Sequence, residues 1–299
     1  MIAATEDAVL ERLRSYGPIG VELRDLSNDP LDGVEFIVPY WSRGLRWDDL
    51  GDLRVVQVLS AGTDWVEDQL PAGVTLCNAR GARDVPVAEW VVGALVGART
   101  GLLRRAREHD RHEWNRFQPA EVAGSTVLIL GLGSIGQAVR RRLEALRAEV
   151  IGVAREARPG VHGADELPGL LPRADAVVVL APLTDDTRGM VDADFLGALP
   201  NGALLLNAAR GAVVDTDALV AELASGRLQA VLDVTDPEPL PSDHPLWDAP
   251  GLLALTPHVA GDTPGGEERA LRFAATQLAR YARGEPLRNV VVQRSVRAS

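Results

Sequence analysis

The sequence of 299 residues contains no lysine, so all 31 of its basic side chains are arginine. Chemistry that needs a lysine amine is therefore excluded, which removes Schiff-base enzymes, pyridoxal phosphate enzymes and the phosphate-binding loop of NTPases. The short-chain dehydrogenases and the 6-phosphogluconate-type dehydrogenases are excluded as well, because both rely on a catalytic lysine.

Cysteine is almost absent, and long apolar runs are absent altogether. The single cysteine, Cys77, excludes an internal disulfide framework and any multi-cysteine zinc or iron–sulfur site. No stretch reaches the ~18 consecutive apolar residues of a membrane-spanning helix. The first ten residues include Glu6 and Asp7 and no long apolar run, so we expect no signal peptide and a cytoplasmic protein.

Positive charge is also in deficit, because 42 acidic residues give a formal net charge of −11. An acidic surface repels polyanions, so we expect neither a nucleic-acid nor a membrane partner. His109 and His112 are three residues apart but have no further ligand cluster near them, and no metal site is predicted. The apolar fraction of 46% is typical of a soluble globular protein with one large domain or two smaller ones.

The strongest local pattern runs from Thr126 to Ile151 and reads as strand, glycine-rich turn, helix and strand. The turn is Gly131-Leu132-Gly133-Ser134-Ile135-Gly136. The first glycine permits a tight turn, the second lets the backbone approach a pyrophosphate, and the third lets helix and strand pack closely. The N-terminus of the helix offers free N–H groups and a positive dipole to phosphates. The whole unit predicts a dinucleotide-binding fold.

Further buried strands alternate with helical segments, which predicts an α/β protein with a Rossmann-type, doubly wound parallel sheet. The strands are expected at Ala176–Leu180, Ala203–Leu206, Ala230–Val234 and Leu252–Thr256. Polar residues follow three of them directly, where ligands bind in such sheets. Weaker strand patterns at Glu35–Val38, Val55–Leu59 and Val74–Leu76 predict a second α/β domain, and Pro86–Arg107 predicts one long helix.

Three of these polar residues are candidates for catalysis. Arg210 can place a planar guanidinium against a carboxylate or carbonyl oxygen, and a surface ion pair is the plainer alternative. His258 is a candidate general acid and base among only five histidines, although a lone histidine often has a structural role. Glu238 can pair with the imidazole, but other acids lie in the same segment, so spacing alone does not select it.

Over nearly its whole length the sequence resembles the D-isomer-specific 2-hydroxyacid dehydrogenase family. The segments that carry this resemblance are Ser60–Asp64, Val87–Glu89, Gly131–Gly136, Ala181–Thr184, Asn207–Gly211, Asp233–Pro239 and Thr256–Gly261. The resemblance implies a catalytic set of Arg210, Glu238 and His258. It also implies that backbone N–H groups near Ala61 and Gly62 bind the substrate carboxylate.

The family also implies a domain organisation and an oligomeric state. We expect a flavodoxin-like substrate-binding domain at residues 1–98, an NAD(P)-binding domain at 99–261, and a return to the substrate-binding domain at 262–299. Members are usually homodimers built on the nucleotide domain, so a homodimer is expected. Because the chain ends soon after the last helix, we expect no appended regulatory domain.

The resemblance names a set of cofactor contacts, in which Asp233 holds the nicotinamide carboxamide. The expected contacts are Gly131, Gly133, Ser134, Ile135, Gly136, Arg155, Ala181, Pro182, Thr187, Ala208, Ala209, Asp233 and Gly261. One position departs from the usual pattern, since Ala154 replaces the acid that binds the ribose 2′-hydroxyl, and Arg155 and Arg158 follow it. We therefore expect NADP(H) to be favoured and NAD(H) to be possible, with Glu156 able to restore NADH if it points inward.

The expected activity is hydride transfer between NAD(P)H and a small 2-ketoacid or D-2-hydroxyacid, such as glyoxylate or hydroxypyruvate. Trp41 and Arg43 are candidates to approach the variable end of the substrate. A phosphoglycerate dehydrogenase is an alternative, although Tyr40–Arg43 lacks the expected Arg-Ser pair. A nucleotide-sensing corepressor is another. Glu238 disfavours a formate dehydrogenase, which carries glutamine there, and the absence of lysine disfavours a phosphite dehydrogenase.

Overall fold

The computed structural model describes residues 1–17, 20–40 and 45–293, and the chain divides into two compact units. The first unit consists of Met1–Arg83 and Thr263–Ser299, and the second unit is Asp84–Asp262. We expected breaks after residues 98 and 261. The first break falls earlier because α2 (Asp84–Arg99) packs Val87, Val91 and Leu95 into the core of the second unit.

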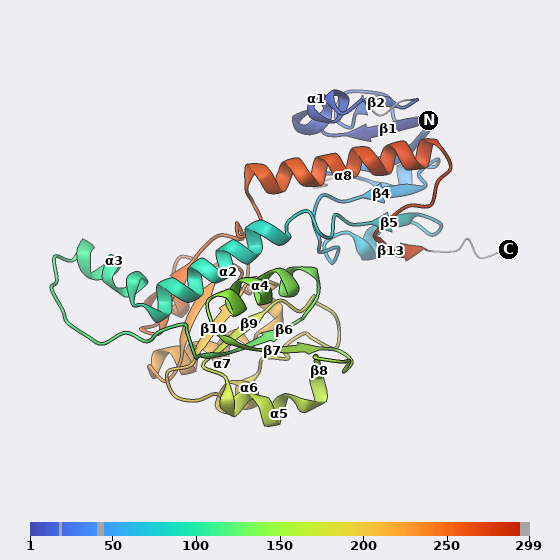
Figure 1. The fold of residues 1–299 in the computed structure, drawn as a ribbon. Helices are drawn as coiled ribbons and strands as arrows, with labels where there is room; N and C mark the ends of the chain where they lie inside the picture. Colours follow the sequence, from blue (N-terminus) through green and yellow to red (C-terminus); the bar gives the residue numbers. More distant parts are fainter. Residues whose placement is uncertain (18–19, 41–44, 294–299) are drawn as a thin grey trace. The chain divides into compact units, whose positions relative to one another are not determined.

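The first unit contains a six-stranded sheet in the order β13-β5-β4-β3-β1-β2. Its strands are β1 (Ile2–Thr5), β2 (Glu22–Asp25), β3 (Val34–Val38), β4 (Val55–Gln57), β5 (Thr75–Cys77) and β13 (Val290–Gln293). Only β13 runs antiparallel to its neighbour. The helices α1 (Asp7–Ser15) and α8 (Pro264–Ala282) contact each other (Figure 1). They share one core with the sheet, in which Leu13 and Leu271 pack with Phe36.

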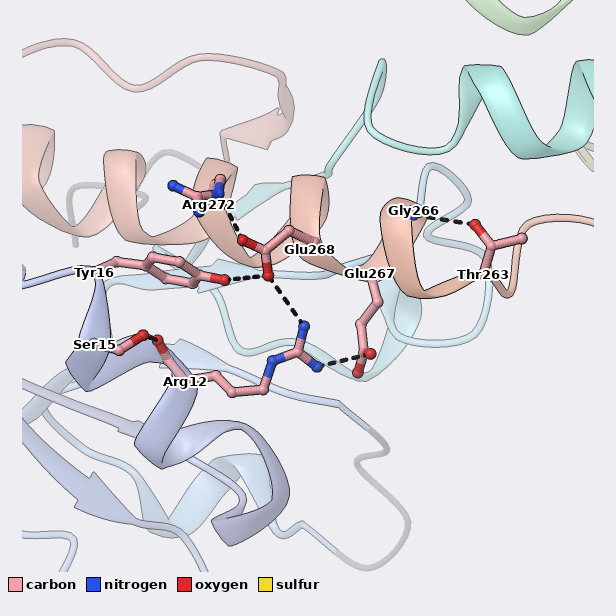
Figure 2. Close-up of polar contacts among 8 residues, drawn as sticks. All are labelled: Arg12, Ser15, Tyr16, Thr263, Gly266, Glu267, Glu268 and Arg272. Atoms are coloured by element: carbon pink, nitrogen blue, oxygen red, sulfur yellow. Dashed lines mark hydrogen bonds and ion pairs between the residues drawn. The ribbon is translucent and has the colours of Figure 1, made fainter.

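Polar contacts join α1 to the first turns of α8 (Figure 2). The Tyr16 hydroxyl donates to Glu268 at 2.5 Å, and Arg12 pairs with Glu267 at 2.7 Å. The hydrogen bond from Tyr16 lowers the pKa of Glu268, with Arg272 adding a further donor. These contacts hold the C-terminal helix against the N-terminal one within the first unit.

The second unit contains a seven-stranded, wholly parallel sheet in the order β12-β11-β10-β9-β6-β7-β8. Its strands are β6 (Thr126–Leu130), β7 (Glu149–Ala154), β8 (His162–Gly163), β9 (Ala176–Val179), β10 (Leu204–Asn207), β11 (Gln229–Leu232) and β12 (Leu252–Leu255).

Helices cover both faces of this parallel sheet (Figure 1), in separate cores. One core contains side chains of α2 and α4 (Ser134–Ala145), and the other contains those of α5 (Leu167–Leu170), α6 (Ala193–Gly197) and α7 (Thr216–Ala224). The predicted doubly wound sheet is therefore confirmed. Its strand order reverses between β6 and β9, and this is the point at which such sheets bind ligands.

The prediction of one long helix at Pro86–Arg107 was wrong, because two helices occupy this stretch. They are α2 and α3 (Leu102–Asp110), which meet at an angle of 70°. Gly101 separates them with φ +72°, a left-handed conformation that ends a helix and that glycine adopts without strain. Among the described residues no single helix is long and apolar enough to cross a membrane, whereas this bent pair meets that criterion by length and composition alone.

Candidate functional site

The glycine loop between β6 and α4 has the close packing that the sequence pattern predicts. Gly131 has φ +104°, and a Cβ atom there would lie 2.5 Å from the carbonyl carbon of Leu180 at the end of β9. A Cβ atom on Gly136 would lie 2.6 Å from the carbonyl oxygen of Gly131. These two glycines therefore let the loop, α4 and the neighbouring strand approach one another.

Gly133 differs from these two glycines, because a Cβ atom there would meet nothing within 4 Å. It is the N-cap of α4, whose first N–H groups have no partner within the helix. An open surface without a side chain beside these N–H groups fits a pyrophosphate, which binds at helix N-termini in this way. The loop therefore fits a dinucleotide. The Ser134 hydroxyl lies 3.1 Å from the Asp84 carboxylate, a contact the sequence did not suggest.

The other expected cofactor contacts follow the C-terminal ends of strands in the same sheet. Arg155 follows β7, Ala181 and Pro182 follow β9, Ala208 and Ala209 follow β10, Asp233 follows β11, and Gly261 lies in the loop after β12. Because all these strands are parallel, the residues lie along one edge. The hydroxyl of Thr187 closes the loop after β9 by donating to the Pro182 carbonyl at 2.6 Å.

The segment after β7 presents two arginines. Arg155 is exposed directly after the last residue of the strand, Ala154. The Arg158 guanidinium donates to the carbonyl of Leu132 at 3.0 Å, which fixes it against the glycine loop. Glu156 is exposed. Arg155 therefore directly follows the position where the dinucleotide fold usually has an acid, and the charge that is held against the glycine loop is that of Arg158.

The structure brings His258 and Glu238 together, although they lie on different loops. The Nδ1 atom of His258 is 2.8 Å from the Oε1 atom of Glu238, and both side chains are nearly half exposed. The carboxylate fixes one ring nitrogen, so Nε2 is the nitrogen that remains for proton exchange with a ligand. His258 has φ +56°, an uncommon conformation for a residue with a side chain.

The buried carboxylate of Asp233 holds the loop that carries His258. Its Oδ1 accepts from the Thr256 hydroxyl at 2.6 Å and from the Val259 N–H at 2.9 Å, and its Oδ2 accepts from the Ala260 N–H at 2.9 Å. The carbonyl of Asp233 also accepts from the His258 N–H at 2.7 Å. The carboxamide contact expected of Asp233 stays a prediction, while its contacts within the protein fix the loop after β12.

Sequence reasoning missed two residues of this arrangement. The indole N–H of Trp90 on α2 donates to the Thr256 hydroxyl at 3.1 Å, and that hydroxyl donates to Asp233. Thr256 lies in a segment that carried the family resemblance, but no physical signal in the sequence marked it. Trp90 lies 166 positions away, so only the fold reveals their contact.

Arg210 lies on the loop after β10, next to the segment that carries Glu238. Asn207 shapes the loop by donating to the Arg210 carbonyl at 3.0 Å and accepting from the Ala209 N–H at 3.0 Å. The next residue, Gly211, touches the backbone of Thr235 so closely that a Cβ atom has no room. The half-buried Arg210 therefore lies on a loop that is packed against the one leading to Glu238.

Of the residues expected to bind substrate, Arg210 and His258 lie in the second unit, and the others lie in the first unit or outside the described part of the chain. Ala61 and Gly62 are half-buried in the loop after β4, and their N–H groups donate to none of the described residues. Trp41 and Arg43 lie outside the described residues. Cys77 is buried, and burial raises the pKa of its thiol to about 11, so the nucleophilic thiolate is scarce at neutral pH.

Comparison with known proteins identifies the family of the chain. Residues 92–260 match the model of the NAD-binding domain of D-isomer-specific 2-hydroxyacid dehydrogenases. The chain belongs to this family. It therefore belongs to a family of oxidoreductases that use a nicotinamide dinucleotide, as the sequence pattern predicted.

Individual relatives agree with this assignment. The chain is 32% identical over 250 residues to a D-3-phosphoglycerate dehydrogenase of Methanocaldococcus jannaschii; the match covers 80% of this chain but only 47% of that relative. A D-isomer-specific 2-hydroxyacid dehydrogenase from Xanthobacter autotrophicus Py2, in complex with NADPH and MES, has a TM-score of 0.86, 30% identity and 98% coverage of both chains. An NADPH-dependent glyoxylate/hydroxypyruvate reductase from Sinorhizobium meliloti has a TM-score of 0.84, 31% identity and the same coverage.

The contacts of Asp233 predict that Asp233→Asn destabilises the fold. The new amide turns one acceptor oxygen into a donor, which leaves a buried N–H or hydroxyl without a partner at a cost of about 1–3 kcal/mol. Urea denaturation should show this loss of unfolding free energy. The exposed Asp248, in the same unit, provides the matched variant Asp248→Asn, which should be neutral. Equal stability of the two variants would contradict the role assigned to Asp233.

Proposed function

We propose that the protein reduces small 2-ketoacids, with glyoxylate and hydroxypyruvate as its substrates and NADPH as the preferred reductant. The observation that carries the proposal is the pairing of His258 with Glu238 at 2.8 Å at the ligand-binding edge of a dinucleotide-binding sheet. Arg210 supports it, because it follows a neighbouring strand of the same sheet.

Each residue of this set has a distinct task in the proposed reaction. Bound NADPH supplies the hydride that adds to the C2 carbonyl carbon. His258, held through Nδ1 by Glu238, gives the proton on Nε2 to the carbonyl oxygen, so that the carbonyl becomes an alcohol. Arg210 polarises that oxygen, where negative charge develops in the transition state. The N–H groups of Ala61 and Gly62 bind the carboxylate.

Replacement of His258 tests the chemical step. His258→Ala should lower the turnover number for glyoxylate by about 100-fold or more, because the proton donor is lost. Arg210→Ala should also lower it, while NADPH affinity stays the same in both variants. His109→Ala, which removes an exposed histidine of α3, is the matched control. Turnover near the wild-type value in either of the first two variants would refute the assignment.

NADPH preference rests on the arginines after β7. A guanidinium forms charge-assisted hydrogen bonds with a 2′-phosphate, and no acid directly after β7 is placed to bind the 2′-hydroxyl instead. Two of the structural relatives are described with NADPH or as NADPH-dependent. Arg158 supports the proposal because the glycine loop fixes its side chain.

The predicted ratio of kcat/KM for NADPH over NADH is at least about ten, since one such contact supplies roughly 1.4 kcal/mol or more. Arg155→Ala and Arg158→Ala should each lower the ratio by raising KM for NADPH alone. Arg141→Ala, an exposed arginine on α4, should leave it unchanged. Wild-type preference for NADH would overturn the proposal. A ratio that neither arginine variant changes would mean that the absence of an acid at position 154, and not the arginines, sets the cofactor preference.

The proposed homodimer forms through the second unit. Trp114 is 95% exposed and Leu102 is 65% exposed, the highest values among the large apolar side chains that the structure describes. The segment that carries Trp114 nevertheless has fixed contacts, because the guanidiniums of Arg104 and Arg105 stack on the ring of Phe117 at 4.5 and 4.0 Å. A segment with fixed contacts that exposes a whole indole ring to solvent is typical of a surface that a second copy of the chain covers.

Sedimentation of the wild-type protein should therefore give a dimer. Trp114→Ser should shift it towards monomer at micromolar concentration, because the exposed indole is lost from the interface. Trp247→Ser, which removes an indole that is 47% exposed, is the matched control and should leave the dimer intact. A monomeric wild type, or a Trp114→Ser dimer as tight as the wild type, would contradict the proposal.

Measuring turnover of a panel of 2-ketoacids and 2-hydroxyacids distinguishes the proposal from two other functions. A phosphoglycerate dehydrogenase is favoured by the relative from Methanocaldococcus jannaschii and would oxidise 3-phosphoglycerate in preference to reducing glyoxylate. A nucleotide-sensing protein would bind NADPH and turn over none of the acids. Reduction of glyoxylate and hydroxypyruvate above all other acids is the result that the proposal predicts.

A further inference from the structure

In the loop after β4, four consecutive backbone carbonyl groups, from Leu59 to Gly62, accept hydrogen bonds. The Leu59 carbonyl accepts from Arg83 at 3.4 Å and the Ser60 carbonyl accepts from the Ala79 N–H at 2.8 Å. The Ala61 carbonyl accepts from the side-chain amide of Asn78 at 2.8 Å. The next carbonyl, of Gly62, accepts from the Ser60 hydroxyl at 2.6 Å. All these groups belong to the first unit.

Within the part of the chain that the structure describes, the N–H groups of the same peptides have no acceptor. In a planar trans peptide the carbonyl of one residue and the N–H of the next point in opposite directions. Holding the carbonyls of Ser60, Ala61 and Gly62 therefore fixes the N–H directions of Ala61, Gly62 and Thr63. None of these three N–H groups donates to a residue that the structure describes. A run of oriented, unpaired backbone N–H groups is an anion-binding surface.

Asn78 is itself held in one orientation. It follows β5 and is half-buried, and its Oδ1 atom accepts from the Arg80 N–H at 3.1 Å. That contact turns the Nδ2 donor towards the Ala61 carbonyl. An aspartate at this position has no donor for the carbonyl and places a negative oxygen beside it. The site therefore requires an amide, since neither a carboxylate nor an apolar side chain of similar size can hold the Ala61 carbonyl.

Ser60 has a second contact that fixes its hydroxyl. The indole N–H of Trp65 lies 3.4 Å from the Ser60 oxygen, while the hydroxyl donates to the Gly62 carbonyl at 2.6 Å. Both contacts lie within the same turn of chain. Trp65 and Ser60 therefore set the third peptide of the run, in the same way that Asn78 sets the second.

We propose that Asn78 and Ser60 are positioning residues for the substrate carboxylate, which the N–H groups of Ala61, Gly62 and Thr63 bind together. This inference rests on the proposed function and adds to it both Thr63 as a third donor and Asn78 as the residue that aims the Gly62 N–H. Neither Asn78 nor Ser60 contacts the substrate. Each acts through the peptide whose carbonyl it holds.

The experiment compares a charged probe with a neutral one in the full-length protein. Oxalate serves as the dicarboxylate probe, measured as a competitive inhibitor and by calorimetry with the NADPH-saturated protein. Methyl glyoxylate serves as the substrate without a carboxylate. Asn78→Ala should weaken oxalate binding and raise KM for glyoxylate by about tenfold, and Asn78→Asp should do so at least as strongly, because an oriented bond to a charged group is lost. KM for methyl glyoxylate and the affinity for NADPH should change less than twofold.

Two further variants keep the test decisive. Ser60→Ala leaves β5 untouched and should weaken oxalate by severalfold, which tests the proposal even if changes at Asn78 unfold the protein. Asn115→Ala removes an exposed side-chain amide whose one hydrogen-bond partner among the described residues is Glu113, and it should have no effect. If the wild type reduces glyoxylate but both Ser60→Ala and a folded Asn78→Ala bind oxalate as tightly as the wild type does, the positioning role is overturned. A wild type that neither binds oxalate nor reduces glyoxylate would instead contradict the proposed function.

Discussion

The buried carboxylate of Asp233 is the contact on which the proposed catalytic geometry depends. It lies at the end of β11 and is only 3% exposed, and it gathers the Thr256 hydroxyl and the Val259 and Ala260 N–H groups. An ionised carboxylate of this kind is tolerated in the interior only when donors surround it. Because those donors come from both sides of His258, the same contacts that stabilise the charge also determine where the imidazole lies.

The parallel sheet explains why residues so far apart in the sequence share one edge. The loops after β10, β11 and β12 carry Arg210, Glu238 and His258, and each begins at the C-terminal end of its strand. Glycines then allow the loops to touch: Gly211 lies against the backbone of Thr235, and Gly131 lies against the end of β9. Substitution at either glycine would separate backbones that the site needs in contact.

The sequence predicted the local features of the fold more reliably than the tertiary ones. The unit from Thr126 to Ile151 could be predicted because strand, glycine turn and helix periodicity all lie within one continuous stretch. The break at Gly101 could not, since an isolated glycine in a helical pattern is often tolerated, and only the ring of Phe117 packed against it shows why the chain turns there.

In the candidate site, too, local sequence patterns were informative and contacts between distant residues were not predictable. Spacing did not distinguish Glu238 from the other acids near it, and the family resemblance was needed to select it before the structure showed the contact with His258. The residues that support the site, Trp90 and Asn78, could not be predicted from the sequence. Trp90 reaches Thr256 only through the packing of α2 on the sheet, and Asn78 reaches the Ala61 carbonyl only through the alignment of β4 with β5.

The proposed reaction transfers hydride from NADPH to C2 of a 2-ketoacid with a defined stereochemical result. The most direct measurement supplies hydroxypyruvate and NADPH deuterated in turn at each face of C4, and analyses the glycerate that forms. The expected product is D-glycerate with one deuterium at C2 from only one of the two labelled cofactors. L-Glycerate, a racemic product, or D-glycerate that carries no deuterium from either cofactor would rule out the proposed reaction.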